Sequence, residues 1–262
     1  MLVVSNGAFK SGSTWLFHIV RRITDFPSPP DTYLRNDRHN PVIDPARLNR
    51  LLADLDINRD NYAVKNHFSE KSQQQLLLSR DYVRVLNIER DLRDVVVSAY
   101  YHYCRVEHDE IDFATYYWHV GRHTADRIRR YNLLWRVDHP HVYVSSYKQL
   151  KTNFVEETKH IGSFLGFELT DDAIIAIYEA TTFKSFQQQT GQDKKPERQR
   201  FFRKGIMGDY ANHFDQAMMN DIAHIEQHGL DYLSRVRISL WHTVRRQMRR
   251  RLLSRSSTQV KS

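Results

Sequence analysis

The chain has 262 residues, of which 40% are hydrophobic and 12% aromatic, so it can bury a sizeable core and is not an intrinsically disordered protein. Its single cysteine, Cys104, excludes an internal disulfide. The net charge of +8 does not indicate a nucleic-acid partner, because nine Lys and Arg residues fall within 235–262 and the rest of the chain carries 30 basic against 31 acidic residues.

The predicted elements begin with a buried strand at 2–5, a loop at 7–12 and a helix at 13–23 that ends before Pro27. Further strands are predicted at 62–64, 83–88 and 142–144, and further helices from about Leu92, at 119–135, over most of 149–165 and at 171–179, the last capped by Asp171 and Asp172. This alternation predicts an α/β fold with a central, mostly parallel sheet flanked by helices, in which ligands bind at the carboxyl ends of the strands. We expect a single domain over 1–235, followed by a basic helix or tail over 236–262.

Residues 7–15 join the first predicted strand to the first predicted helix, where backbone amides and a helix N-terminus can bind an anion. Gly7 and Gly12 have the spacing of a Walker A loop, but Ser13 stands where the Walker lysine is expected. The lysine comes earlier, at Lys10. This departure disfavours a P-loop kinase or ATPase, which stays the alternative enzyme class.

Residues 10–15, Lys-Ser-Gly-Ser-Thr-Trp, resemble the 5′-phosphosulfate loop of cytosolic-type PAPS-dependent sulfotransferases, which reads K-S-G-T-T-W (PAPS is 3′-phosphoadenosine-5′-phosphosulfate). The resemblance implies a fold of the P-loop nucleotide-kinase type, PAPS as co-substrate, PAP as product and no metal. It also implies that Trp15 lies against the adenine. The nucleotide-binding residues implied in this loop are Lys10, Ser11, Gly12, Ser13, Thr14 and Trp15.

A second segment, residues 90–98, resembles the family's R-N-x-x-D-V-x-V-S sequence, with Asp91 in place of Asn. If a helix begins near Leu92, Arg90 at the strand end and Ser98 two helical turns later can address one phosphate. The resemblance implies that this is the 3′-phosphate. We expect Arg93, which lies between them, to be a solvated helix residue.

A third segment, residues 203–210, resembles the family's R-K-G-x-x-G-D-W, with Tyr210 in place of Trp. Arg203, Lys204 and Gly205 suit a loop that surrounds a phosphate with side chains and amides. The same resemblance implies adenosine contacts from Tyr147, Thr181 and Phe201.

Sulfuryl transfer needs in-line positioning, charge stabilisation and a base for the acceptor proton. Lys65-Asn66-His67 follows a predicted strand and resembles the family's K-T-H-L-P segment, whose histidine is the base. Strand alternation places Lys65 and His67 on one face. The resemblance implies that His67 is the general base. We assign Lys10 to the oxygen that leaves with the 5′-phosphate, and Lys65 to the transferring group.

The acceptor is not identified by these patterns: a hydroxyl of a small molecule, sugar or lipid is preferred to an amine. A non-catalytic nucleotide-binding or interaction protein stays an alternative. We expect a cytoplasmic protein, because the sequence shows no signal-peptide pattern and no long apolar stretch. Apolar residues at helical spacing within 240–252 predict either a terminal helix packed on the body or peripheral membrane contact through the basic tail.

Overall fold

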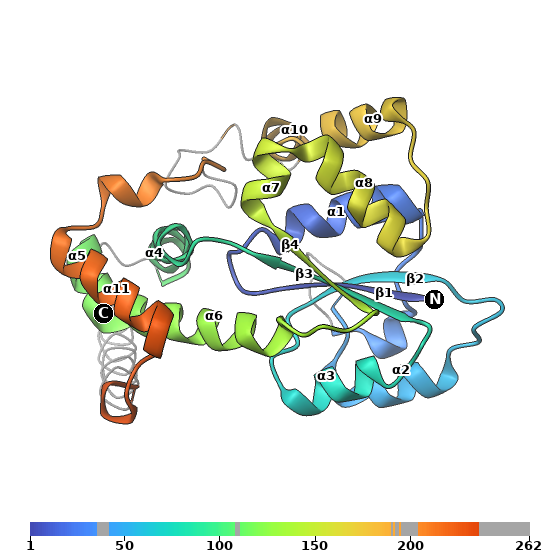
Figure 1. The fold of residues 1–262 in the computed structure, drawn as a ribbon, viewed down its shortest axis with the longest axis horizontal. Coiled ribbons are helices and arrows are strands. Elements are labelled where there is room, and N and C mark those ends of the chain that lie inside the picture. The colour runs from blue at the N-terminus through green and yellow to red at the C-terminus, as the bar shows by residue number, and fades with distance from the viewer. Residues whose placement is uncertain (36–41, 108–110, 190, 192–193, 195–203, 236–262) are drawn as a thin grey trace, which may run out of the picture. The chain divides into compact units, whose positions relative to one another are not determined.

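The computed structural model describes residues 1–35, 42–107, 111–189, 191, 194 and 204–235. These residues form two compact units (Figure 1). The first comprises Met1–Asp91 and Tyr131–Met207, and the second comprises Leu92–Arg130 and the described residues from Gly208 onward.

The first unit contains a four-stranded parallel sheet with strand order β2-β1-β3-β4. The strands are β1 (Leu2–Gly7), β2 (Tyr62–Asn66), β3 (Val83–Glu89) and β4 (Val142–Ser146). The two central strands are almost wholly buried, as expected for a parallel sheet covered on both faces. The predicted α/β fold with a parallel sheet is therefore confirmed.

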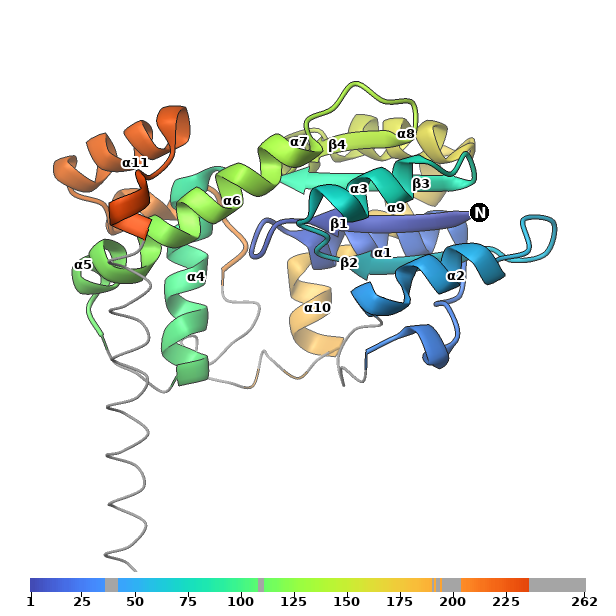
Figure 2. The ribbon, with the colours of Figure 1, turned by 90° about the horizontal axis from the view of Figure 1, so that it is seen from below.

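Helices cover both faces of this sheet. The described helices and single turns assigned here are α1 (Ser13–Thr24), η1 (Asp31–Tyr33), η2 (Pro45–Arg47), α2 (Leu48–Asp54), α3 (Lys71–Leu78), α7 (Tyr147–Thr152), α8 (Phe154–Leu165), α9 (Asp171–Thr181) and α10 (Phe183–Gln189). On one face lie α1, α8 and α9, and on the other lie α2 and α3 (Figure 2). The helix α1 packs through Leu16, Ile19, Val20 and Ile23, which recur at helical spacing and are all buried.

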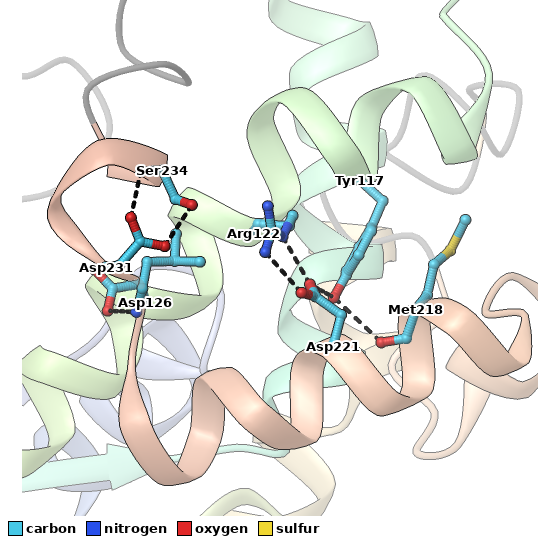
Figure 3. Close-up of polar contacts among 8 residues, drawn as sticks. Tyr117, Arg122, Asp126, Met218, Asp221, Asp231 and Ser234 are labelled. Atoms are coloured by element: carbon cyan, nitrogen blue, oxygen red, sulfur yellow. Dashed lines mark hydrogen bonds and ion pairs between the residues drawn. The ribbon is translucent and has the colours of Figure 1, made fainter.

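The second unit is helical. It holds α4 (Leu92–Glu107), α5 (Phe113–Tyr116), a π-helical turn η3 (Tyr117–Gly121), the first part of α6 (Arg122–Trp135), η5 (Asp209–Asn212) and α11 (Gln216–His228). The carboxylate of Asp221 on α11 accepts hydrogen bonds from Arg122 at 2.8 and 2.7 Å and from the Tyr117 hydroxyl at 2.8 Å (Figure 3). These charge-assisted bonds fix α11 against the start of α6.

Three local predictions need correction. The helix predicted at 119–135 starts within the π turn η3 and becomes α-helical only from Arg122; in this turn Gly121 comes so close to α4 that an added Cβ would lie 3.1 Å from Val96. The helix over 149–165 is split at Asn153, which has a non-helical backbone. The N-cap of α9 is Thr170, whose hydroxyl accepts a hydrogen bond from the Ala173 amide. The two aspartates lie in the first turn of α9.

In the described ranges, no helix is long and apolar enough to cross a membrane. The boundary at 235 and the single-domain arrangement stay predictions. The basic segment 236–262 lies outside the described residues.

Candidate functional site

The strand order places a topological switch point between β1 and β3. From β1 the chain goes to β2 on one side, and from β3 it goes to β4 on the other. Loops that leave the carboxyl ends of two such strands diverge, which makes this edge of the sheet the expected ligand site. All four strands deliver candidate residues there: Lys10 and Gly12 follow β1, His67 follows β2, Arg90 follows β3 and Tyr147 follows β4.

The loop after β1 has a constrained backbone. Lys10 has φ 66° and Gly12 has φ 103°, both in the left-handed region. The Ser11 hydroxyl donates to the Ala8 carbonyl at 2.5 Å, which holds the turn together. A Cβ on Gly12 would lie 2.7 Å from the ring of Tyr147, so only glycine fits here without a shift. Left-handed lysines are uncommon, and strain of this kind concentrates at functional sites.

The helix α1 begins directly after this loop, at Ser13. It has no acidic residue in its first turn, and its N-cap residue, Gly12, has no side chain to cap the first amides. The positive end of the helix dipole is therefore not offset by a carboxylate of its first turn. Such a helix end favours a bound anion.

The end of β2 brings two side chains to the same loop. Lys65 is 7% exposed, and its ammonium donates a hydrogen bond to the Thr14 hydroxyl at 2.9 Å. His67 is more exposed, and its Nδ1 hydrogen-bonds the Gly7 carbonyl. Lys65 and His67 thus reach opposite ends of the loop, Thr14 and Gly7.

The contact of His67 determines its tautomer. A carbonyl oxygen only accepts, so Nδ1 must carry the ring proton. In the neutral ring Nε2 then bears the lone pair, which can take a proton.

The ends of β3 and β4 meet at Tyr147. The Arg90 guanidinium lies over the Tyr147 ring, 4.4 Å from its centroid. Arg90 also donates to the Ile206 carbonyl at 2.9 Å, which connects the second and third sequence motifs although they lie more than 100 residues apart. Gly205, with φ 62°, packs so closely on Phe183 that a Cβ there would lie 2.4 Å from its ring. Arg90, Tyr147 and the loop at Gly205 therefore form one continuous group.

Trp15 lies beside this group. Its ring centroid is 5.5 Å from that of Tyr147 and 6.1 Å from that of Phe154, on which it stacks. Its buried indole N–H has no hydrogen-bond partner within the described part of the chain. The Lys151 ammonium lies 5.4 Å from the Trp15 ring centroid. Burial, and next the positive charge of Arg90, lower the pKa of Lys151.

Sequence reasoning missed Lys151. The predicted helix began at 149, so the local pattern did not place Lys151 one helical turn after Tyr147.

Sequence reasoning also missed His18, which lies four residues after Thr14 on α1. Its ring contacts Phe186 at a centroid distance of 4.7 Å. Burial, and next the charge of Lys65, lower the pKa of His18 to about 4. His18 is therefore neutral at pH 7.

Other motif residues lie in the second unit. Ser98 is on α4, whose start at Leu92 agrees with the predicted helix. The Asp94 carboxylate accepts a hydrogen bond from the Gly208 amide at 3.0 Å. The expectation for Arg93 is wrong: its guanidinium packs on the Tyr210 ring, 4.0 Å from the centroid, so it is not merely solvated.

The remaining predicted residues are less closely connected. Thr181 is 1% exposed, and its hydroxyl donates to the Ile177 carbonyl within α9 at 2.7 Å, so that hydroxyl is already used by the helix. Lys204 is exposed at the start of the described segment. Phe201 and Arg203 lie outside the described residues. Of the residues that the structure describes, no three His, Cys, Asp or Glu side chains are grouped so that they could hold a metal ion.

Comparisons with known proteins agree with the fold. A family model described as "Sulfotransferase domain" matches residues 3–234. Sulfotransferase 6B1 of Danio rerio is 32% identical over 114 residues, which cover 42% of this chain and 38% of that protein. Sulfotransferase 1A1 of Canis lupus familiaris is 25% identical over 260 residues, which cover 87% of this chain and 80% of that protein. The chain therefore spans less than two thirds of the Danio rerio relative.

Among solved structures, mouse sulfotransferase SULT7A1 complexed with PAP has a TM-score of 0.64 at 19% sequence identity. The match covers 92% of this chain and 88% of the mouse chain. At this level of identity the likeness shows a shared fold.

Proposed function

The chain belongs to the sulfotransferase domain family, and from this premise we propose that it transfers a sulfuryl group from PAPS to a hydroxyl of a small-molecule, sugar or lipid acceptor, with PAP as the product. One observation carries the proposal. The end of β2 delivers a buried ammonium, Lys65, and a histidine, His67, to the anion-binding loop that precedes α1.

The residues present fit the nucleotide. The N-terminal amides of α1 and the Thr14 hydroxyl suit the 5′-phosphosulfate. Trp15, held in place by stacking on Phe154, is the aromatic ring that we assign to the adenine. Arg90, held on the Tyr147 ring, is a fixed cation for the 3′-phosphate.

The nucleotide-binding set that we propose is the one implied by resemblance. It comprises Lys10, Ser11, Gly12, Ser13, Thr14, Trp15, Arg90, Ser98, Tyr147, Thr181, Phe201, Arg203, Lys204 and Gly205.

When bound, PAPS supplies an activated sulfuryl group whose leaving group is the 5′-phosphate of PAP. His67 accepts the proton of the acceptor hydroxyl on Nε2, because its Nδ1 proton is held by the Gly7 carbonyl. That carbonyl also stabilises the protonated ring, since Nδ1–H continues to donate to it. As its proton moved to His67, the acceptor oxygen would bond to sulfur, and the bond between sulfur and the 5′-phosphate oxygen would break, so that this oxygen leaves with PAP.

Two lysines stabilise charge in this scheme. Lys65 is buried, so its ammonium acts through a medium that screens it less than water does. We assign it to the oxygens of the transferring group. Lys10, held in a left-handed conformation at the tip of the loop, is assigned to the oxygen that leaves with the 5′-phosphate.

The test is turnover with PAPS and a panel of phenols, sugars and lipid alcohols, read by release of PAP and by the mass of the product. We expect a sulfated product from the wild type, a rate at least about 100-fold lower from His67→Ala, and an unchanged rate from the matched variant His228→Ala, which alters an exposed histidine on α11. Transfer to amines alone would contradict the assignment of a hydroxyl acceptor. Phosphorylation of an acceptor from ATP would favour a kinase, and PAP binding without transfer to any acceptor would favour a binding protein.

The cellular location stays a prediction, as does membrane contact through residues 236–262. A cytoplasmic enzyme is consistent with the proposal. The test of membrane contact is binding to anionic vesicles with and without 236–262.

A further inference from the structure

Two aromatic rings at the carboxyl edge of the sheet each have a cationic side chain lying over them. Arg90 lies over Tyr147 with 4.4 Å to the centroid, and Lys151 lies over Trp15 with 5.4 Å. The two rings contact each other edge to face at 5.5 Å. These residues come from separate elements. Tyr147 and Lys151 are both on the short helix α7, whereas Arg90 directly follows β3.

The two cations are close enough to repel each other. The charge of Arg90 contributes to the lowered pKa of Lys151, after burial. Burial and the charge of Arg90 are the two causes of that shift, and no carboxylate is among them. A like-charged pair without a carboxylate at Lys151 is unfavourable in the protein alone, and an anion with two or more negative charges beside both cations relieves it.

A contact with Trp15 would by itself explain why Lys151 lies where it does. It does not explain why a second cation is held beside it by Tyr147, the residue that also closes on Gly12 of the phosphate loop. The loop that we assign to the 5′-phosphosulfate already has a cation of its own, because Lys65 donates a hydrogen bond to Thr14. Lys151 lies instead over Trp15, whose ring contacts Tyr147, and Tyr147 is the ring that Arg90 covers.

We propose that Lys151 binds the 3′-phosphate of the nucleotide together with Arg90, and that it is one of the residues by which the protein prefers PAP and PAPS to adenine nucleotides without that phosphate. This inference rests on the proposed function and adds to it a residue that sets nucleotide specificity. The ammonium donates to phosphate oxygens as a charged group, whereas Arg90 provides a planar, fixed fork of donors.

The experiment is calorimetric titration of the full chain with PAP and, separately, with AMP, which lacks the 3′-phosphate. The main variant is Lys151→Gln, which removes the charge and retains most of the stem over Trp15. The matched control is Lys148→Gln, which removes the same charge from the same helix, and Lys148 is exposed as Lys151 is. Lys151→Arg is the conservative variant, and a thermal melt of each protein verifies folding.

We expect Lys151→Gln to weaken PAP binding about tenfold and AMP binding less than about twofold. Lys148→Gln should leave both affinities unchanged, and Lys151→Arg should restore most of the preference for PAP. Equal losses for PAP and AMP in Lys151→Gln would overturn the proposal, because they would mean that Lys151 only supports Trp15. Wild-type affinity for PAP in Lys151→Gln would also overturn it, while leaving the proposed function intact. Absence of PAP binding by the folded wild type would overturn both.

Discussion

Replacement of Gly12 by alanine tests the packing of the phosphate loop against Tyr147. Gly12 has φ 103°, and an added Cβ would lie 2.7 Å from Cδ2 and 3.2 Å from Cε2 of the Tyr147 ring. The ring cannot easily move away, because the Arg90 guanidinium lies over it and Trp15 contacts its edge. Gly12→Ala therefore combines backbone strain with a steric clash.

The two contributions can be estimated separately. A left-handed conformation costs a residue with a Cβ about 1–2 kcal/mol. Overpacking of a well-packed site costs about 1–3 kcal/mol. We therefore expect Gly12→Ala to lower the free energy of unfolding by about 2–5 kcal/mol. The Tyr147 ring supports Arg90, which we assign to the 3′-phosphate. We therefore also expect a displaced ring to weaken the binding of PAP.

Gly166→Ala is the matched control. Gly166 also has a positive φ, 83°, but a Cβ there would have nothing within 4 Å, so only the backbone strain remains. Chemical denaturation of both variants gives the comparison, and we expect Gly12→Ala to be more destabilising than Gly166→Ala by about 1–3 kcal/mol. Equal losses of stability would refute the close packing of Gly12 on Tyr147.

Three further predictions concern other parts of the chain. The folded pKa of His18, about 4, lies below its ordinary value of 6.5, so the unfolded chain takes up a proton first as the pH falls. Stability should therefore decline by about 2 kcal/mol from pH 6.5 to 4, allowing for partial solvent access, and His18→Gln should flatten that decline in denaturation curves; an unchanged slope would contradict it. His67→Ala should lower the transfer rate at least about 100-fold while PAP affinity, measured by calorimetry, changes less than about twofold; a similar loss of affinity would indicate a binding role instead. Asp221→Asn should cost about 2 kcal/mol of unfolding free energy, because Arg122 and Tyr117 lose a charged acceptor; no loss by chemical denaturation would show that these bonds contribute little.

The positions of the strands and of the phosphate loop could be predicted from the sequence, because both follow from local patterns. Apolar runs identified the four strands, and the parallel sheet then requires that the loops after them meet at one edge. His67 and Lys65 could be placed on one face from strand alternation alone. Their contacts with Gly7 and Thr14 are consistent with that expectation.

Features that depend on tertiary contacts could not be predicted. Lys151 is recognisable only once α7 has brought it over Trp15 and close to Arg90. Arg93 looked solvated because its partner, Tyr210, is more than 100 residues away in sequence. The low pKa of His18, on α1, arises from burial and from the charge of Lys65 on β2, which no local pattern reveals.

The most direct test of the account is calorimetric titration of the wild-type chain with PAP and with ATP. Arg90, supported by the Tyr147 ring and the Ile206 carbonyl, is the cation that should distinguish the two nucleotides. The account predicts clear binding of PAP, little binding of ATP, and loss of most PAP affinity in Arg90→Ala. Preference for ATP over PAP by the folded protein would contradict it.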